Sequence, residues 1–130
     1  MNFLSDLLKL KSLFVANAIV LGCSGICAIL LPSFVLSLYG VESGPAVQLM
    51  AQYAGLGSLV IGLIAWFSRN VTDSKAQRSI VTAFLICYVI GTIVSVFGTI
   101  SGTMKIGWAV IGLYLLFALG YGYILLFKLD

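Results

Sequence analysis

The sequence has 130 residues, of which 62% are hydrophobic and only 8% are charged. A soluble domain of this size leaves about a third of its unfolded surface exposed, and about 25% of its residues are typically charged. The composition therefore excludes a soluble enzyme, a disordered chain and a disulfide-rich secreted module, and it indicates an integral membrane protein. The net charge of +3 is too small for a nucleic-acid-binding protein and suits contact with anionic membrane lipids.

The chain begins with a predicted amphipathic helix over residues 2–11. Phe3, Leu4, Leu7 and Leu8 recur at helical spacing, with polar residues on the opposite face. Such a segment is expected to lie in the membrane–water interface. A frayed N-terminal tail is the alternative interpretation.

Four apolar stretches follow, each long enough to cross a bilayer, which takes about 20 residues. Their predicted limits are 12–31, 46–67, 79–100 and 106–127, and none of them contains a charged residue. They predict an all-α fold in which residues 1–130 form a single domain, a bundle of four transmembrane helices in two hairpins. The second helix of each hairpin begins similarly, with Gly44-Pro45-Ala46-Val47 and Gly107-Trp108-Ala109-Val110.

Residues 32–39, after the first span, predict a second short interfacial helix. Pro32 disfavours continuation of the preceding helix, and Gly40 is typical of a helix end. A kink at Pro32, with the first span continuing to Leu38, is the alternative. Further along, Ser74-x-x-Gln77 predicts a capping box that opens the third span, beside Asp73.

The basic residues predict an orientation, because cytoplasmic loops of membrane proteins are enriched in Lys and Arg. Six basic residues fall on one side of the predicted spans, and only Lys105 falls on the other. Both termini are therefore expected to face the cytoplasm. The six residues are Lys9, Lys11, Arg69, Lys75, Arg78 and Lys128.

The most polar side chains near or within the spans are candidate intramembrane contacts. Asn17 lies near the inner end of the first span, whereas Gln48, Gln52 and Tyr53 lie near the outer end of the second. Amides in hydrocarbon usually form hydrogen bonds across helix interfaces, so we expect a structural role. A substrate pocket at Gln48, Gln52 and Tyr53 is the alternative.

Small residues at four-residue spacing predict close helix packing. Ala54, Ser58 and Gly62 form such a pattern in the second span, and Ala18 and Gly22 form one in the first. Association of helices in lipid depends on close packing, which small residues permit. We therefore expect Ala54, Ser58 and Gly62 to form a packing seam.

Three cysteines, Cys23, Cys27 and Cys87, lie inside apolar segments. Apolar surroundings make a thiol unreactive, so these cysteines are expected to be buried small apolar side chains. A redox role is the less favoured interpretation. The sequence contains no histidine, and its predicted spans contain no Asp, Glu, Lys or Arg. Proton relays, ion-coupled transport and metal sites normally use those residues, so we expect no catalytic residue, no metal and no enzyme activity.

Several short motifs occur along the chain: Leu31-Pro32, Leu38-Tyr39-Gly40, Ala54-Gly55-Leu56-Gly57 and Ala65-Trp66-Phe67-Ser68-Arg69. In these the chain resembles small four-helix membrane proteins of bacteria that are DoxX-like or uncharacterised. The resemblance implies a bacterial inner membrane. Some DoxX-type proteins are described as quinone-linked or thiol-linked redox subunits, so the resemblance also implies such a role as one expectation for this chain.

Three functions are compatible with these features. The favoured one is an accessory or structural subunit that packs, among membrane lipids, with partner membrane proteins or with itself. The second is a small oligomeric transporter or channel for an apolar or neutral solute. The third is a membrane redox subunit that uses Cys23, Cys27 or Cys87. No cofactor is expected for the favoured function, and its cofactor-binding residues, if any, are unknown.

Overall fold

The computed structural model describes residues 3–102 and 106–127, with side chains from Lys9 onward. Those residues form the helices α1 (Phe3–Leu30), α2 (Pro32–Tyr39), α3 (Pro45–Ser68), α4 (Ser74–Ile100) and α5 (Gly107–Phe127). α3, α4, α5 and the Lys9–Leu30 part of α1 are long and apolar enough to cross a membrane. The predicted all-α fold with four membrane-spanning helices is therefore confirmed.

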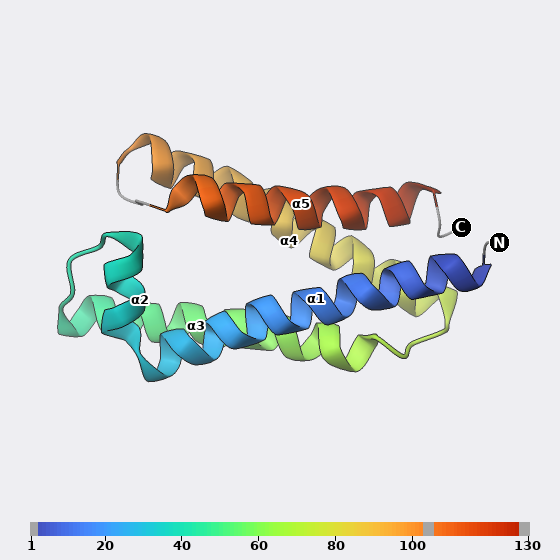
Figure 1. The fold of residues 1–130 in the computed structure, drawn as a ribbon, viewed down its shortest axis with the longest axis horizontal. Helices are drawn as coiled ribbons and strands as arrows, with labels where there is room; N and C mark the ends of the chain where they lie inside the picture. Colours follow the sequence, from blue (N-terminus) through green and yellow to red (C-terminus); the bar gives the residue numbers. More distant parts are fainter. Residues whose placement is uncertain (1–2, 103–105, 128–130) are drawn as a thin grey trace.

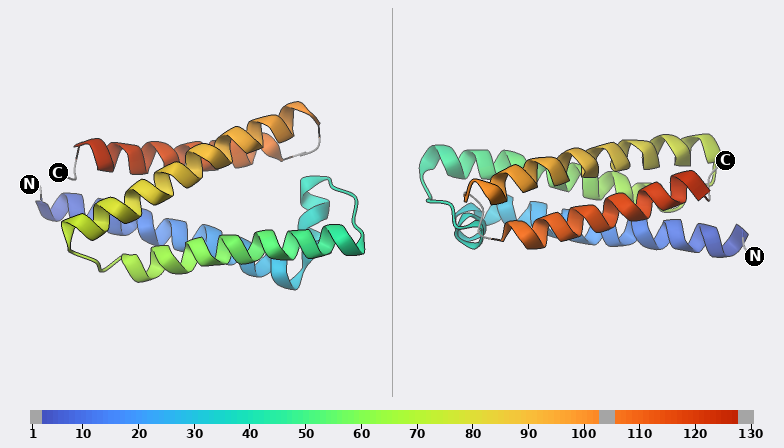
Figure 2. Two further views of the ribbon diagram at one scale, coloured as in Figure 1. Left: turned by 180° about the vertical axis from the view of Figure 1, so that it is seen from behind. Right: turned by 90° about the horizontal axis from the view of Figure 1, so that it is seen from above.

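The long helices pack as two hairpins, α1 with α3 and α4 with α5 (Figure 1). This pairing confirms the predicted hairpin arrangement. The two hairpins lie close together at the end that holds both termini and diverge toward the other end (Figure 2). α1 and α5 provide the main contact between the hairpins. Side chains on α1 and α5 are therefore expected to form contacts that join the two hairpins.

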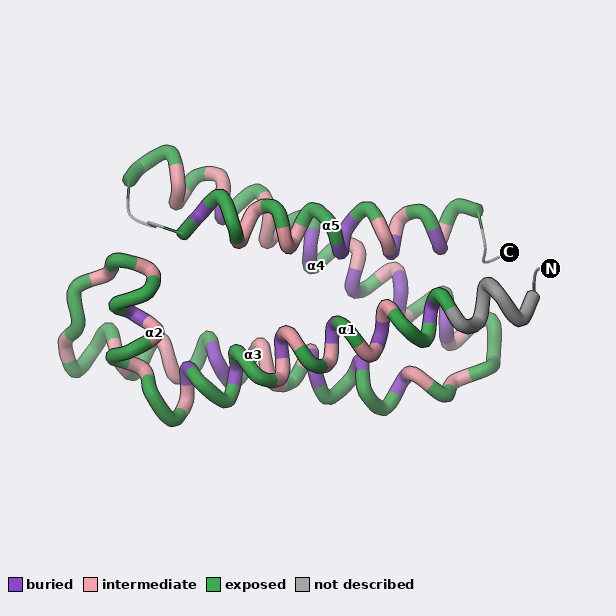
Figure 3. Tube along the Cα trace, in the orientation of Figure 1, coloured by how far each residue is buried: buried purple, intermediate pink, exposed green. Residues whose placement is uncertain are grey.

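The buried core contains residues of all four long helices: Leu10, Phe14, Leu21, Ala65, Val81, Phe84, Tyr88, Phe117, Ala118, Tyr121 and Ile124. Buried positions alternate with exposed ones along each helix (Figure 3). Many large apolar side chains, such as Phe67, Leu116 and Leu126, remain exposed. In a membrane these outer side chains would contact lipid, which removes the hydrophobic penalty for leaving them uncovered.

The N-terminal segment is part of α1 and does not form a helix of its own. α1 runs without a break from Phe3 to Leu30, and Asn2 lies outside the described residues. Neither proline nor glycine interrupts the sequence before Gly22, so nothing local ends the helix between the predicted interfacial segment and the first span. The structure thus corrects the prediction of a separate helix over residues 2–11.

α2 is a separate helix over Pro32–Tyr39, as the sequence predicts, and the kinked continuous helix is excluded. Leu31 leaves the helical conformation, with φ −130° and ψ 59°, and Pro32 is the first residue of α2. Gly40 ends the helix with φ 74°, and the N–H of Val41 donates to the carbonyl oxygen of Leu36 at 2.9 Å. α2 contacts α3 and folds away from the axis of α1 (Figure 1).

We expect Gly40→Ala to destabilise the end of α2 by about 1–2 kcal/mol, because the left-handed conformation brings Cβ of an L-residue close to the following carbonyl oxygen. Hydrogen exchange of the amides in residues 32–41 would report the loss as faster exchange. Gly112→Ala is the control, because that glycine is helical and an added Cβ meets no atom within 4 Å. Equal exchange in the two variants would contradict the strain at Gly40.

The start of α4 differs from the predicted capping box. Asp73 is the N-cap, and its Oδ2 accepts a hydrogen bond from the Ala76 N–H at 2.9 Å. Ser74 is instead the first helical residue, and Nε2 of Gln77 donates to the carbonyl oxygen of Val71 at 2.8 Å. The aspartate carboxylate is the stronger acceptor next to the positive end of the helix, which favours it over the serine hydroxyl.

Candidate functional site

A buried polar cluster joins three of the long helices. Nδ2 of Asn17 on α1 donates to the Tyr121 hydroxyl on α5 at 2.8 Å. The Tyr88 hydroxyl on α4 donates to Oδ1 of the same asparagine. Asn17 and Tyr121 are 0% exposed, and Tyr88 is 3% exposed. These three residues, here called the Asn17 cluster, connect the α1–α3 hairpin to the α4–α5 hairpin.

The depths of Asn17 and Tyr121 explain why they meet. Asn17 lies eight residues after Lys9, the first of the two lysines that precede the uncharged stretch of α1, and Tyr121 lies six residues before Phe127, the last residue of α5. At 1.5 Å per residue, Asn17 is about 12 Å along α1 from Lys9, and Tyr121 is about 9 Å from the end of α5. Both ends are at the same side of the molecule (Figure 1), so the two side chains reach a similar level.

Aromatic rings surround the Asn17 cluster. The ring centroid of Phe84 lies 5.3 Å from that of Tyr121, and the ring of Phe117 stacks on Tyr88 at 5.1 Å. Phe14 packs edge-on against Phe84 at 6.0 Å. An apolar shell of this kind strengthens the hydrogen bonds inside it and raises the free-energy cost of breaking them.

The chemistry of the Asn17 cluster is that of a structural contact. It offers one amide and two phenols, and a phenol with an ordinary pKa of about 10 is neutral at pH 7. Every buried side-chain nitrogen and oxygen among the described residues has a hydrogen-bond partner. Within the same residues, no group of three or more His, Cys, Asp or Glu could hold a metal ion. The arrangement can therefore hold helices together, and its groups already bind one another.

The other predicted polar residues lie apart from the Asn17 cluster. Nε2 of Gln52 donates to the carbonyl oxygen of Ile29 at 3.0 Å and so links α3 to the end of α1. Nε2 of Gln48 donates to the Ser43 hydroxyl at 2.7 Å, within the connection that precedes α3. Tyr53 is 65% exposed on the outside of α3. Gln48 and Gln52 thus form two separate contacts within the chain.

The contact between α1 and α3 uses part of the predicted packing seam. A Cβ at Gly62 would lie 2.7 Å from the backbone nitrogen of Gly22, and a Cβ at Gly55 would lie 2.7 Å from Cβ of Ala28. Ala54 is exposed and Ser58 is half-buried. Seven residues rotate a helix face by only about 20°, whereas eight residues rotate it by about 80°, so Gly55 shares the face of Gly62 and Ala54 does not.

The three cysteines are exposed and free, which corrects the prediction that they are buried. The inner face of α1 is occupied by Leu21, Gly25 and Ala28, at the three- to four-residue spacing of a helix. Cys23 and Cys27 consequently face outward, and Cys87 does so on α4.

Two residues of the Asn17 cluster, Tyr88 and Tyr121, were not predicted from the sequence. The signal that could have identified them is their position inside apolar spans, where a hydroxyl group requires a partner. Matching the depth of Tyr121 with that of Asn17 would have indicated the pair.

Comparisons with protein families, with curated proteins and with solved structures find no match for the chain. The four candidate spans identify it as a multi-pass membrane protein. Its more specific function must be inferred from its own residues.

Proposed function

We propose that this chain is an accessory or structural membrane subunit that packs with partner membrane proteins or with a second copy of itself. The observation that carries the proposal is the exposure of two glycines, Gly57 on α3 and Gly112 on α5. A Cβ at either position would meet no atom within 4 Å.

An exposed glycine inside a helix costs about 1 kcal/mol relative to alanine. Gly55 and Gly62 offset that penalty by allowing α1 and α3 to approach closely, whereas Gly57 and Gly112 gain nothing inside the chain. Small residues on a membrane helix allow another helix to pack closely against it. Ala54 is exposed three residues before Gly57, and Ala109 is exposed three residues before Gly112. Residues three apart are neighbours on a helix, so each alanine enlarges the small-residue surface around its glycine.

Two other functions have weaker support. A neutral-solute transporter would use Gln48 and Gln52, but the amide groups of both residues already donate to partners within the chain. A redox subunit would use the cysteines, which are free thiols on the outer faces of α1 and α4. Neither observation favours these functions over packing.

The proposal includes a bacterial inner-membrane location, a DoxX-like relationship and cytoplasmic termini. The start of α1, the α3–α4 connection and the end of α5 lie at one end of the molecule (Figure 1). The basic residues of those segments support a cytoplasmic assignment. Arg69 is one of them, and its guanidinium lies 3.7 Å from the ring centroid of Trp66, a residue type enriched at membrane interfaces.

The test is purification of the tagged chain in mild detergent after crosslinking in cells, with a second, differently tagged copy present. We expect a stoichiometric partner or the second copy to be recovered. Gly57→Leu or Gly112→Leu should reduce that recovery about tenfold, which corresponds to about 1.4 kcal/mol of association free energy.

Ala83→Leu is the matched control, because Ala83 is exposed on α4. None of the three variants should unfold at a lower temperature than the parent chain. A monodisperse chain without a partner, or full recovery with both glycine variants, would contradict the proposal.

A further inference from the structure

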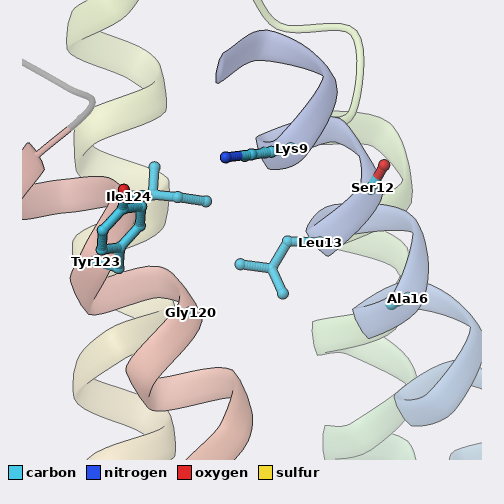
Figure 4. A pocket seen from close by; sticks show the side chains of 7 residues that line it. All are labelled: Lys9, Ser12, Leu13, Ala16, Gly120, Tyr123 and Ile124. Carbon is cyan, nitrogen blue, oxygen red and sulfur yellow. The ribbon is translucent and has the colours of Figure 1, made fainter. Parts of the chain in front are cut away.

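An open groove of about 660 Å³ lies between α1 and α5, at the end of the molecule that holds both termini. Figure 4 shows its lining: Lys9, Ser12, Leu13, Ala16, Gly120, Tyr123 and Ile124. Ile124 is 5% exposed and lies at the bottom, whereas Ser12, Ala16 and Tyr123 are exposed at the sides. The groove therefore has an apolar floor and opens on the outer surface of the bundle.

The absence of a side chain at Gly120 keeps this groove open on the α5 side. A Cβ there would lie 3.2 Å from Cδ2 of Leu13, which is tighter than an ordinary carbon–carbon contact. The volume falls within the range of about 300–1,000 Å³ that is typical of small-molecule sites.

The lining changes from charged to apolar with depth. Lys9 lies three residues before Ser12, where the uncharged stretch of α1 begins, so its ammonium group is expected at the level of the lipid headgroups. Leu13 and Ala16 follow by four and seven residues, which places them about 6 Å and about 10 Å deeper. In Figure 4 the Lys9 side chain extends across the groove toward Ile124.

The charge at this end of the molecule favours an anionic occupant. Lys9 belongs to the groove, and Lys11 is exposed two residues later. The α3–α4 connection lies at the same end (Figure 1), and Arg69 and Lys75 are the basic residues at its two ends. Basic pockets between transmembrane helices bind the headgroups of anionic lipids.

We propose that the groove binds an anionic phospholipid, with an acyl chain along Leu13, Ala16 and Gly120 and the phosphate at Lys9. An alkyl chain matches the apolar floor and the lipid-facing opening. A phosphate matches the single ammonium group at headgroup depth. This site does not depend on the proposed packing function, because neither Gly57 nor Gly112 lines it.

The experiment titrates the purified full chain with dioleoylphosphatidylglycerol or dioleoylphosphatidylcholine and counts bound lipids by native mass spectrometry. We expect one phosphatidylglycerol to bind about fivefold more tightly than phosphatidylcholine, as expected for one lysine beside an anionic headgroup. Lys9→Gln should remove this preference. Lys11→Gln is the matched control and should retain it.

A second pair of variants tests the acyl-chain site. Ala16→Phe should fill the groove and reduce binding of both lipids, whereas Ala83→Phe, on exposed α4 surface, should leave binding unchanged. Equal loss of the preference in the two lysine variants, or parental lipid binding by Ala16→Phe, would overturn the proposal. Loss of a dimer instead of a lipid in Ala16→Phe would also overturn it, since it would assign the groove to a second copy.

Discussion

Asn17→Leu is expected to lower the free energy of unfolding by about 2–4 kcal/mol, because each buried polar group left without a partner costs about 1–3 kcal/mol. Leucine preserves most of the volume but leaves the hydroxyl groups of Tyr88 and Tyr121 without the amide that both now contact. The surrounding rings of Phe84 and Phe117 offer no replacement partner.

The size of this effect depends on what the hydroxyl groups contact in the unfolded chain. Hydrogen bonds between membrane helices contribute only about 0.6 kcal/mol on average, because the unfolded state in a membrane also forms polar contacts. The Asn17 cluster should exceed that average, since one substitution removes two bonds and all three residues are at most 3% exposed. Unfolding titrations with SDS in mixed micelles would measure the difference.

A compensating variant distinguishes the cost of unpaired hydroxyl groups from the cost of altered side-chain packing. The chain that combines Asn17→Leu with Tyr88→Phe and Tyr121→Phe has lost both hydroxyl groups that contact Asn17, so the Asn17 cluster leaves no hydroxyl group unpaired. Removing both sides of a hydrogen bond is nearly neutral when shape is preserved, so this variant should recover most of the lost stability. If it were as unstable as Asn17→Leu alone, packing and not hydrogen bonding would account for the effect.

The features that the sequence predicted well depend on local signals. The four spans follow from hydropathy, and α2 follows from Pro32 and Gly40, which act on the backbone wherever the helix lies. The hairpin pairing was predicted from a local resemblance, the similar starts of the second and fourth spans at Gly44 and Gly107. None of these inferences requires knowledge of which helix face points inward.

Apart from the continuous α1 and the Asp73 cap, the features that the sequence did not predict require that knowledge. In a soluble helix the apolar stripe marks the buried face, but a membrane helix is apolar on both its lipid-facing and its protein-facing sides. Cys23 and Cys27 were therefore placed inside when they face outward, and Ala54 was chosen where Gly55 makes the contact. The partners of Asn17 were missed for the same reason, because nothing local assigns Tyr121 to its face.

A second large loss of stability is expected from a substitution at the contact between α1 and α3. Gly55→Leu is expected to destabilise the chain by about 3 kcal/mol, at the upper end of the usual range for overpacking. A Cβ at Gly55 would already lie 2.7 Å from Cβ of Ala28 and 2.8 Å from the carbonyl oxygen of Gly25. Backbone atoms cannot rotate away, so the two helices must separate.

Gly57→Leu is the matched control, two residues along the same helix, where an added Cβ meets no atom within 4 Å. It should stabilise the isolated chain slightly, because leucine has a higher helix propensity than glycine by up to about 1 kcal/mol. The two substitutions should thus shift SDS unfolding in opposite directions. A loss of similar size at Gly57 would indicate a general effect of bulk on α3 and would contradict the close approach at Gly55.

Combining Gly55→Leu with Asn17→Leu tests whether the two contacts act independently. Gly25, opposite Gly55, lies eight residues from Asn17 on α1, a separation of about 12 Å along the helix. Effects at sites this far apart usually add within about 0.5 kcal/mol. We therefore expect the double variant to lose the sum of the two single losses, since one contact closes the α1–α3 hairpin and the other joins that hairpin to α4 and α5. A smaller combined loss would mean that opening the hairpin already releases the Asn17 cluster.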